Sequence, residues 1–107
     1  MAFEVLEVAL QMVGSLREPL AALERRDPSL AGQVRRAAAS VPLNIGEGRR
    51  RVGKDRVHLW RVAAGSADEV ATALRVGEAF GYVRGSELAA SLELCDRVLA
   101  MLYRLTH

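Results

Sequence analysis

The sequence predicts an all-α protein, an antiparallel up-down four-helix bundle. Ala, Leu, Arg and Glu, which favour helices, dominate the chain, and alternating apolar–polar runs typical of strands are absent. Half of the 107 residues are apolar but only 5% are aromatic, so the core must be built from Leu, Val and Ala. The expected connections are short, which places consecutive helices antiparallel. A chain of 107 residues, 1–107, fits a single domain.

The first expected helix runs from about Phe3 to Arg25, where leucines and valines recur at spacings of three and four. Pro19 interrupts it. Proline lacks an amide hydrogen and clashes with the preceding turn, so we expect a kink or a short break there. A turn at residues 27–29 should follow, with Ser29 as the N-cap of the next helix.

The second expected helix begins near Leu30 and should bend around Pro42, which removes the amide that normally bonds to the carbonyl of Ala38. Gly48 is expected as its C′ cap, before a loop over residues 49–53. The apolar line of this helix comprises Leu30, Val34, Ala37 or Ala38, Val41 and Ile45.

The third expected helix, from about Lys54 to Phe80, carries two apolar stripes, so it has neighbours on both sides or meets another subunit. The fourth runs from about Glu87 to Leu105, with Ser86 as its cap. It also carries two apolar stripes. Together these faces exceed what one small bundle buries, which predicts a homo-oligomer.

Three segments resemble a known family: QVRRAAASVPLNIGEG at residues 33–48, AAGSADE at 63–69 and AFGYV at 79–83. The chain is similar here to the small bacterial four-helix-bundle family of 23S ribosomal RNA intervening-sequence proteins. Gly46 departs from the usual pattern, in which Ala is common. The resemblance implies a bundle that assembles into a closed homo-oligomeric ring, often a homopentamer. It also implies a fold like that of the accessory protein of diversity-generating retroelements, which binds nucleic acid and a reverse transcriptase. The residues that carry the structural motif are Pro42, Asn44, Glu47, Gly48, Gly65, Ser66 and Glu69.

The polar residues of this motif allow two interpretations. Glu47 and Glu69 could form a carboxylate pair that binds a metal or transfers protons. Alternatively, they pair with arginines such as Arg36, while Asn44 bonds the carbonyl that Pro42 leaves free. We favour the second, structural interpretation. Gly65 and Ser66 are expected where two helices approach closely.

The sequence predicts no catalytic residues, no metal site and no cofactor. His58 is the only internal histidine and has no second ligand at metal-binding spacing. Cys95 lies on an apolar stripe of the last helix and is expected to be buried. A single cysteine forms no internal disulfide, and neither a secretory signal nor a membrane span is evident. We therefore expect a cytoplasmic protein that does not contact membranes.

The distribution of charge suggests an anionic partner. Residues 25–61 hold ten basic and three acidic side chains, a net +7, whereas the rest of the chain is at −5, consistent with the overall +2. Arginine guanidinium groups match phosphate oxygens bidentately. Trp60 could stack on bases, although a packing or interface role is more typical. The residues expected to contact phosphates are Arg35, Arg36, Arg49, Arg50, Arg51, Lys54 and Arg56.

These observations predict a non-enzymatic, oligomeric module that binds RNA or DNA, or serves as an accessory to a nucleic-acid enzyme such as a reverse transcriptase. The alternative is a structural or adaptor homo-oligomer that binds a protein partner through its basic surface, without nucleic-acid contact. An enzymatic role would need Glu47, Glu69 or His58 to converge in an open pocket.

Overall fold

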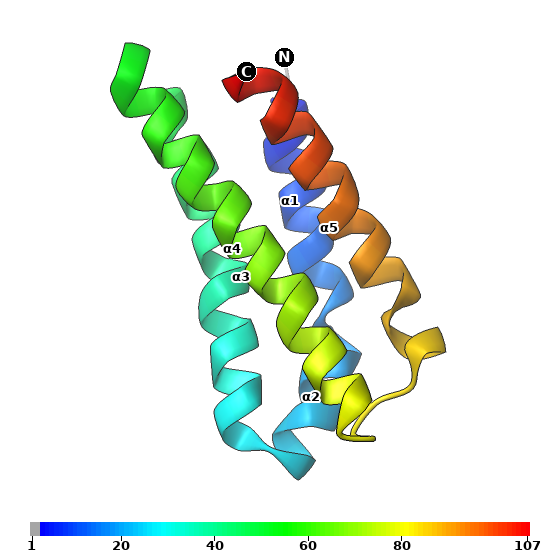
Figure 1. Cartoon of the computed structure of the whole chain (residues 1–107). Coiled ribbons are helices and arrows are strands. Elements are labelled where there is room, and N and C mark those ends of the chain that lie inside the picture. Colours follow the sequence, from blue (N-terminus) through cyan, green and yellow to red (C-terminus); the bar gives the residue numbers. More distant parts are fainter. Residues whose placement is uncertain (1–2) are drawn as a thin grey trace.

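The computed structural model describes residues 3–107, and this part of the chain contains five helices and no strands (Figure 1). The all-α prediction is confirmed, but there are five helices rather than four. The molecule is elongated, with principal extents of 42 × 22 × 21 Å. The helices are α1 (Glu4–Ser15), α2 (Arg17–Arg26), α3 (Pro28–Arg49), α4 (Gly53–Ala79) and α5 (Gly85–Thr106).

The first expected helix is divided into α1 and α2 at Leu16, three residues before Pro19. The amide of Leu16 bonds to the carbonyl of Val13 at 3.1 Å, which ends α1. Pro19 becomes the third residue of α2, where amide hydrogens have no intrahelical partner. The predicted break is therefore present. It places Pro19 in the first turn of α2, where the missing amide donor costs the helix least stability.

Both N-caps expected from the sequence are wrong. Asp27, not Ser29, caps α3: its carboxylate accepts a hydrogen bond from the amide of Leu30 at 3.0 Å, and Pro28 takes the first helical position. At α5 the helix begins before Ser86, and the side chain of Glu87 accepts from the amide of Arg84 at 2.8 Å.

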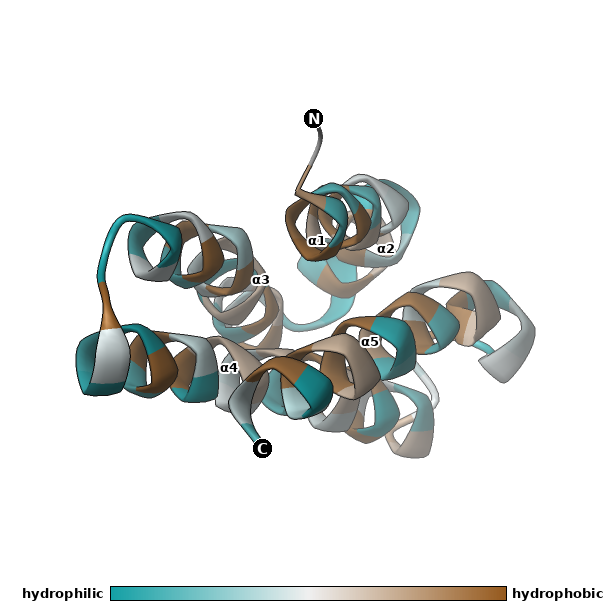
Figure 2. Ribbon diagram, turned by 90° about the horizontal axis from the view of Figure 1, so that it is seen from above, coloured by the Kyte–Doolittle hydropathy of each residue, from teal (hydrophilic) through white to brown (hydrophobic). Residues whose placement is uncertain are grey.

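α4 lies between α3 and α5 and packs most extensively against α3 (Figure 2). The first of the two predicted explanations for its apolar stripes, that the helix has neighbours on both sides, is therefore confirmed. α5 also packs on α1, and α2 packs on α3. The side chains of Val62 and Val76, which belong to these stripes, remain 38% exposed. The largest fully buried side chains include Met12, Leu16, Leu23, Ile45, Leu74, Leu88 and Leu102.

Cys95 is fully buried in this core, as predicted. Burial raises the pKa of its thiol to about 11, and the neighbouring Asp96 carboxylate contributes to the rise. Within residues 3–107, no helix combines the length and apolar character that crossing a bilayer requires.

Candidate nucleic-acid interface

The α3–α4 turn lies at one end of the molecule, and close packing of α3 on α4 positions it (Figure 1). Gly48 is buried because the indole ring of Trp60 covers it. A Cβ atom at Gly48 would lie 2.6 Å from both Cδ1 and Nε1 of Trp60. Gly48 is thus a close-approach position and not the expected C′ cap, since α3 continues to Arg49.

Trp60 has a structural role and is not available to stack on bases. Its side chain is buried, and its Nε1–H donates a hydrogen bond to the carbonyl of Ile45 at 3.1 Å. The Phe3 ring packs nearby, with the two ring centroids 5.8 Å apart. These contacts tie α4 to the last turns of α3 and to the segment that leads into α1.

The polar motif of α3 is largely structural. α3 runs through Pro42 without interruption. The Asn44 side-chain amide donates to a backbone carbonyl, as expected, but the carbonyl is that of Ser40 at 2.9 Å and not that of Ala38. The hydroxyl of Ser40 in turn bonds to that of Ser66 on α4, 2.8 Å away. Ser66 is therefore a contact position between helices, as predicted.

The two carboxylates of the motif are engaged differently from the expected pairing. Glu47 accepts from Arg51, one turn later, at 2.8 Å, and not from Arg36. Glu69 lines a shallow hollow between α3 and α4 and has no ion pair recorded within residues 3–107. Gly65 lines the same hollow and is exposed, and a Cβ atom there would meet nothing within 4 Å, so its expected close approach is wrong.

No cluster of three or more histidine, cysteine, aspartate or glutamate side chains suited to a metal ion occurs in the described part of the chain. His58 is exposed on α4.

Four basic side chains of the α3–α4 turn, Arg49, Arg50, Arg51 and Lys54, are exposed together. The guanidinium of Arg49 lies over the ring of Phe3, 4.9 Å from its centroid. Arg51 holds the exposed ion pair with Glu47, which contributes little to stability and competes weakly with a phosphate. For Arg50 and Lys54, no ion pair is recorded within residues 3–107. We call these four residues the basic turn.

Arg56, which was expected to contact phosphates, instead forms hydrogen bonds within the protein. It is half-buried and donates to the carbonyls of Gly48 and Arg49 at 3.2 and 3.1 Å, while its guanidinium lies over the Trp60 ring. Carbonyls at a helix C-terminus lack intrahelical donors, and a cation there also favours the helix dipole. Arg56 therefore caps α3.

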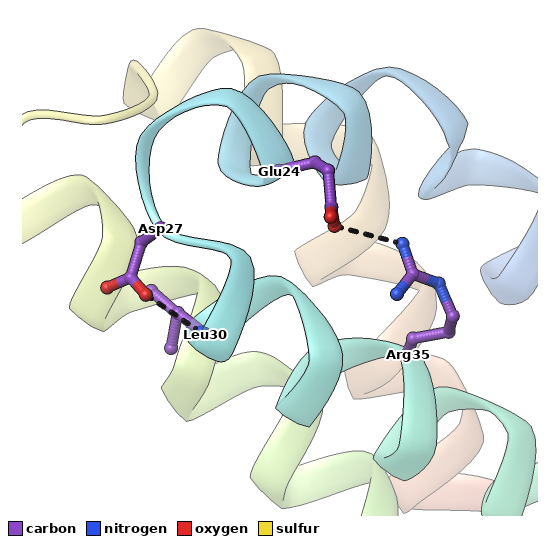
Figure 3. A network of polar contacts seen from close by, with 4 residues as sticks. All are labelled: Glu24, Asp27, Leu30 and Arg35. Carbon is purple, nitrogen blue, oxygen red and sulfur yellow. Dashed lines mark hydrogen bonds and ion pairs between the residues drawn. The ribbon is translucent and has the colours of Figure 1, made fainter.

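Arg35 and Arg36 lie farther down α3. Arg35 pairs with Glu24 of α2 at 3.3 Å, and both side chains are more than half exposed (Figure 3). Arg36 is exposed beside Gly32. Because α3 is uninterrupted, the fourteen residues from Arg35 to Arg49 span roughly 21 Å along one face. The two groups of arginines thus share a face but not a single site.

Sequence reasoning missed a second basic surface, at Arg61. Its guanidinium donates to the carbonyl of Thr106 at 3.2 Å, which joins α4 to the end of α5. The Tyr103 and His107 rings stack nearby, with centroids 4.0 Å apart. The spacing of Lys54, His58 and Arg61 at i, i+4 and i+7 places them on one face of α4 and could have indicated this surface. The neighbouring α5 residues are too distant in sequence for such a pattern.

Comparisons with known proteins agree with this fold. A crystal structure of a protein of unknown function from the S23 ribosomal protein family, from Bacteroides thetaiotaomicron, superposes with a TM-score of 0.86. The superposition covers 95% of this chain and 97% of the other, and at 15% sequence identity it shows the fold alone. A search of curated proteins finds no match. The family model for the 23S rRNA-intervening sequence protein matches residues 2–104. The chain therefore belongs to the 23S rRNA-intervening sequence protein family.

Proposed function

We propose that this protein is a non-enzymatic nucleic-acid-binding or accessory module that contacts RNA or DNA phosphates through the basic turn. The observation that carries the proposal is the exposure of Arg49, Arg50, Arg51 and Lys54 together at one end of the molecule. The family's name, which refers to 23S rRNA, favours RNA. Arg36 extends the surface along α3, whereas Arg56 acts by holding the turn in shape.

One chain offers only about five phosphate contacts, which alone give weak binding at physiological salt. We therefore propose that α1 and α2 together act as one arm of an up-down four-helix bundle, and that this bundle assembles into a homo-oligomeric ring, as the family resemblance implies. A ring repeats the basic turn around its circumference and raises affinity through multivalency. A reverse transcriptase or another nucleic-acid enzyme is a fitting partner for such a ring.

The test is a fluorescence-anisotropy titration with labelled RNA and DNA at several salt concentrations. Replacing Arg49, Arg50 and Arg51 by Ala should weaken binding and make the slope of log affinity against log salt shallower by about two for a single strand. The matched control replaces Arg25 and Arg26 in the last turn of α2 and Arg75 near the end of α4, and so removes the same charge. These two helix ends lie opposite the α3–α4 turn (Figure 1). Equal losses in both variants, or no binding by the unmodified protein, would contradict the proposal.

The alternative is a structural or adaptor homo-oligomer that binds protein. Its support is the set of large exposed apolar side chains on several helices, such as Leu10 at 48%, Leu43 at 69% and Leu105 at 44% exposure. Under this alternative, the triple arginine substitution impairs assembly or partner binding, and nucleic acid does not bind even at low salt.

A further inference from the structure

Two shallow hollows on the α4–α5 side of the molecule meet at Arg61. The first is lined by five residues of α4, and Lys54, His58 and Arg61 stand there beside Gly53 and Val57. The second lies between α4 and the last turns of α5, where Ala64 and Leu99 line it beside Tyr103 and His107. Together they place cationic side chains next to exposed aromatic rings.

Arg61 is held where the two hollows meet, and it has N–H donors available for a ligand. One guanidinium nitrogen donates to the Thr106 carbonyl at 3.2 Å, which fixes the side chain across the two helices. A guanidinium carries five N–H donors, and no other hydrogen bond of Arg61 is recorded within residues 3–107. The side chain is exposed, so the remaining donors can reach an oxyanion in either hollow.

The rings of Tyr103 and His107 form a fixed aromatic platform. Their planes are 18° apart, with centroids at 4.0 Å. The His107 Nδ1 lies 3.1 Å from the Tyr103 carbonyl oxygen and 3.1 Å from the Thr106 hydroxyl, which orients the imidazole. Tyr103 is nevertheless 62% exposed, although an aromatic ring gains by being covered.

An aromatic platform beside an arginine and a lysine has the chemistry of a site for an unpaired nucleotide. Bases stack on aromatic side chains whatever their identity, and arginine binds the accompanying phosphate. In a duplex the bases stack on one another inside the helix, so their faces are not available to the aromatic platform.

We propose that a base of single-stranded nucleic acid stacks on the Tyr103 ring and continues the Tyr103–His107 stack, while Arg61 binds its phosphate and Lys54 links this site to the basic turn. The inference rests on the proposed function and adds to it a single-strand-specific site. It also extends the surface around the end of the molecule, from α3 to α5.

The experiment measures binding of fluorescein-labelled ten-nucleotide RNA and DNA single strands, and of the corresponding duplexes, by anisotropy. Tyr103→Ala should weaken single-strand binding by about five- to a hundredfold, the usual effect of losing one stacked base. The duplex affinity and the salt slope should not change, because stacking displaces no counterions. Tyr103→Phe should retain binding. Arg61→Ala should weaken binding and also reduce the salt slope.

The matched control is Phe80→Ala, which removes an aromatic side chain of similar exposure, 65%, at the α4–α5 connection. It should leave all affinities unchanged. Unchanged single-strand binding in Tyr103→Ala, with binding still sensitive to substitution of the basic turn, would overturn this inference alone. Absence of nucleic-acid binding in the unmodified protein would overturn the proposed function as well. A changed molar mass in Tyr103→Ala would show that the platform is a subunit contact and would also overturn the inference.

Discussion

At the scale of single residues, two glycines of α3 that are separated only by Glu47 have opposite roles. A Cβ atom at Gly48 would collide with the Trp60 indole at 2.6 Å, whereas one at Gly46 would meet nothing within 4 Å. Gly48→Ala should therefore lower the free energy of unfolding by about 1–3 kcal/mol through overpacking. Gly46→Ala should raise it by about 0.5–1 kcal/mol, because alanine loses less backbone entropy in a helix. Urea denaturation of both variants checks this, and similar shifts in the two midpoints would contradict it.

The buried thiol of Cys95 should make stability depend on pH in the alkaline range. The pKa is about 11 in the folded chain against 9.0 for the ordinary group, so between these values the unfolded state has lost a proton that the folded state keeps. The free energy of unfolding should therefore fall as pH rises from 9 to 11, by about 2 kcal/mol from this group.

Cys95→Ala isolates that contribution, because other groups that titrate above pH 9 are common to both proteins. The difference in the free energy of unfolding between the two proteins should change with pH over this window and be constant below it. A constant difference from pH 7 to pH 11 would show that the thiol ionises with its ordinary pKa.

How far the sequence predicts a residue's role depends on whether that role is local. The position of Cys95 on an apolar stripe was enough to predict its burial. Gly48 was misassigned as a helix cap because its actual constraint, the Trp60 ring, comes from twelve residues along the chain and across a turn. For the same reason, Arg56 is included among the arginines expected to contact phosphates, although its donors are directed at carbonyls of α3.

At the scale of helices, the start of α3 gives a direct test of capping. The Asp27 carboxylate accepts from the Leu30 amide at 3.0 Å, and Ser29, which the sequence suggested as the cap, lies inside the helix. Asp27→Ala should lower the free energy of unfolding by about 0.5–2 kcal/mol. Ser29→Ala, at an exposed helical position two residues away, should change it by less than about 0.5 kcal/mol. Thermal denaturation of both variants distinguishes the two caps, and a larger loss in Ser29→Ala would reverse the assignment.

The sequence predicted which segments form helices, but it did not predict the residues at which each helix begins and ends. The spacing of apolar residues predicted every helical segment, and Pro19 predicted the break between α1 and α2. The ends differed by one to three residues, because proline at a first helical position moves the cap to the residue before it. At α5, a carboxylate three residues into the helix replaced the expected serine hydroxyl.

At the scale of the whole molecule, the sequence predicted that positive charge is concentrated in residues 25–61. It did not predict how the fold distributes these side chains over separate surfaces. The basic segment folds so that Arg35 faces Glu24 of α2, the basic turn occupies one end, and Arg61 reaches α5. Only the tertiary arrangement brings Arg61 beside Tyr103. Linear charge patterns therefore indicated an anionic partner, while the aromatic platform that would make the site single-strand-specific depended on helix pairing.

The homo-oligomer proposed above needs an apolar surface where subunits meet, and we propose the outer face of α3 and α4 for it. The bonds from Ser40 to Ser66 and from Ile45 to Trp60 set these helices in antiparallel register, which brings Leu43 level with Val62. Leu43 is 69% exposed and Val62 is 38% exposed, so an apolar area is open to a second copy.

Leu43→Glu combined with Val62→Glu should reduce the molar mass measured by light scattering to that of one chain, because burying two unpaired carboxylates opposes association. Phe80→Glu, at an exposed aromatic position on the α4–α5 connection, should leave the mass unchanged. If the double variant keeps the mass of the unmodified oligomer, the subunits meet through another face. If the unmodified protein is already a single chain, the multivalent binding proposed for the basic turn has no basis.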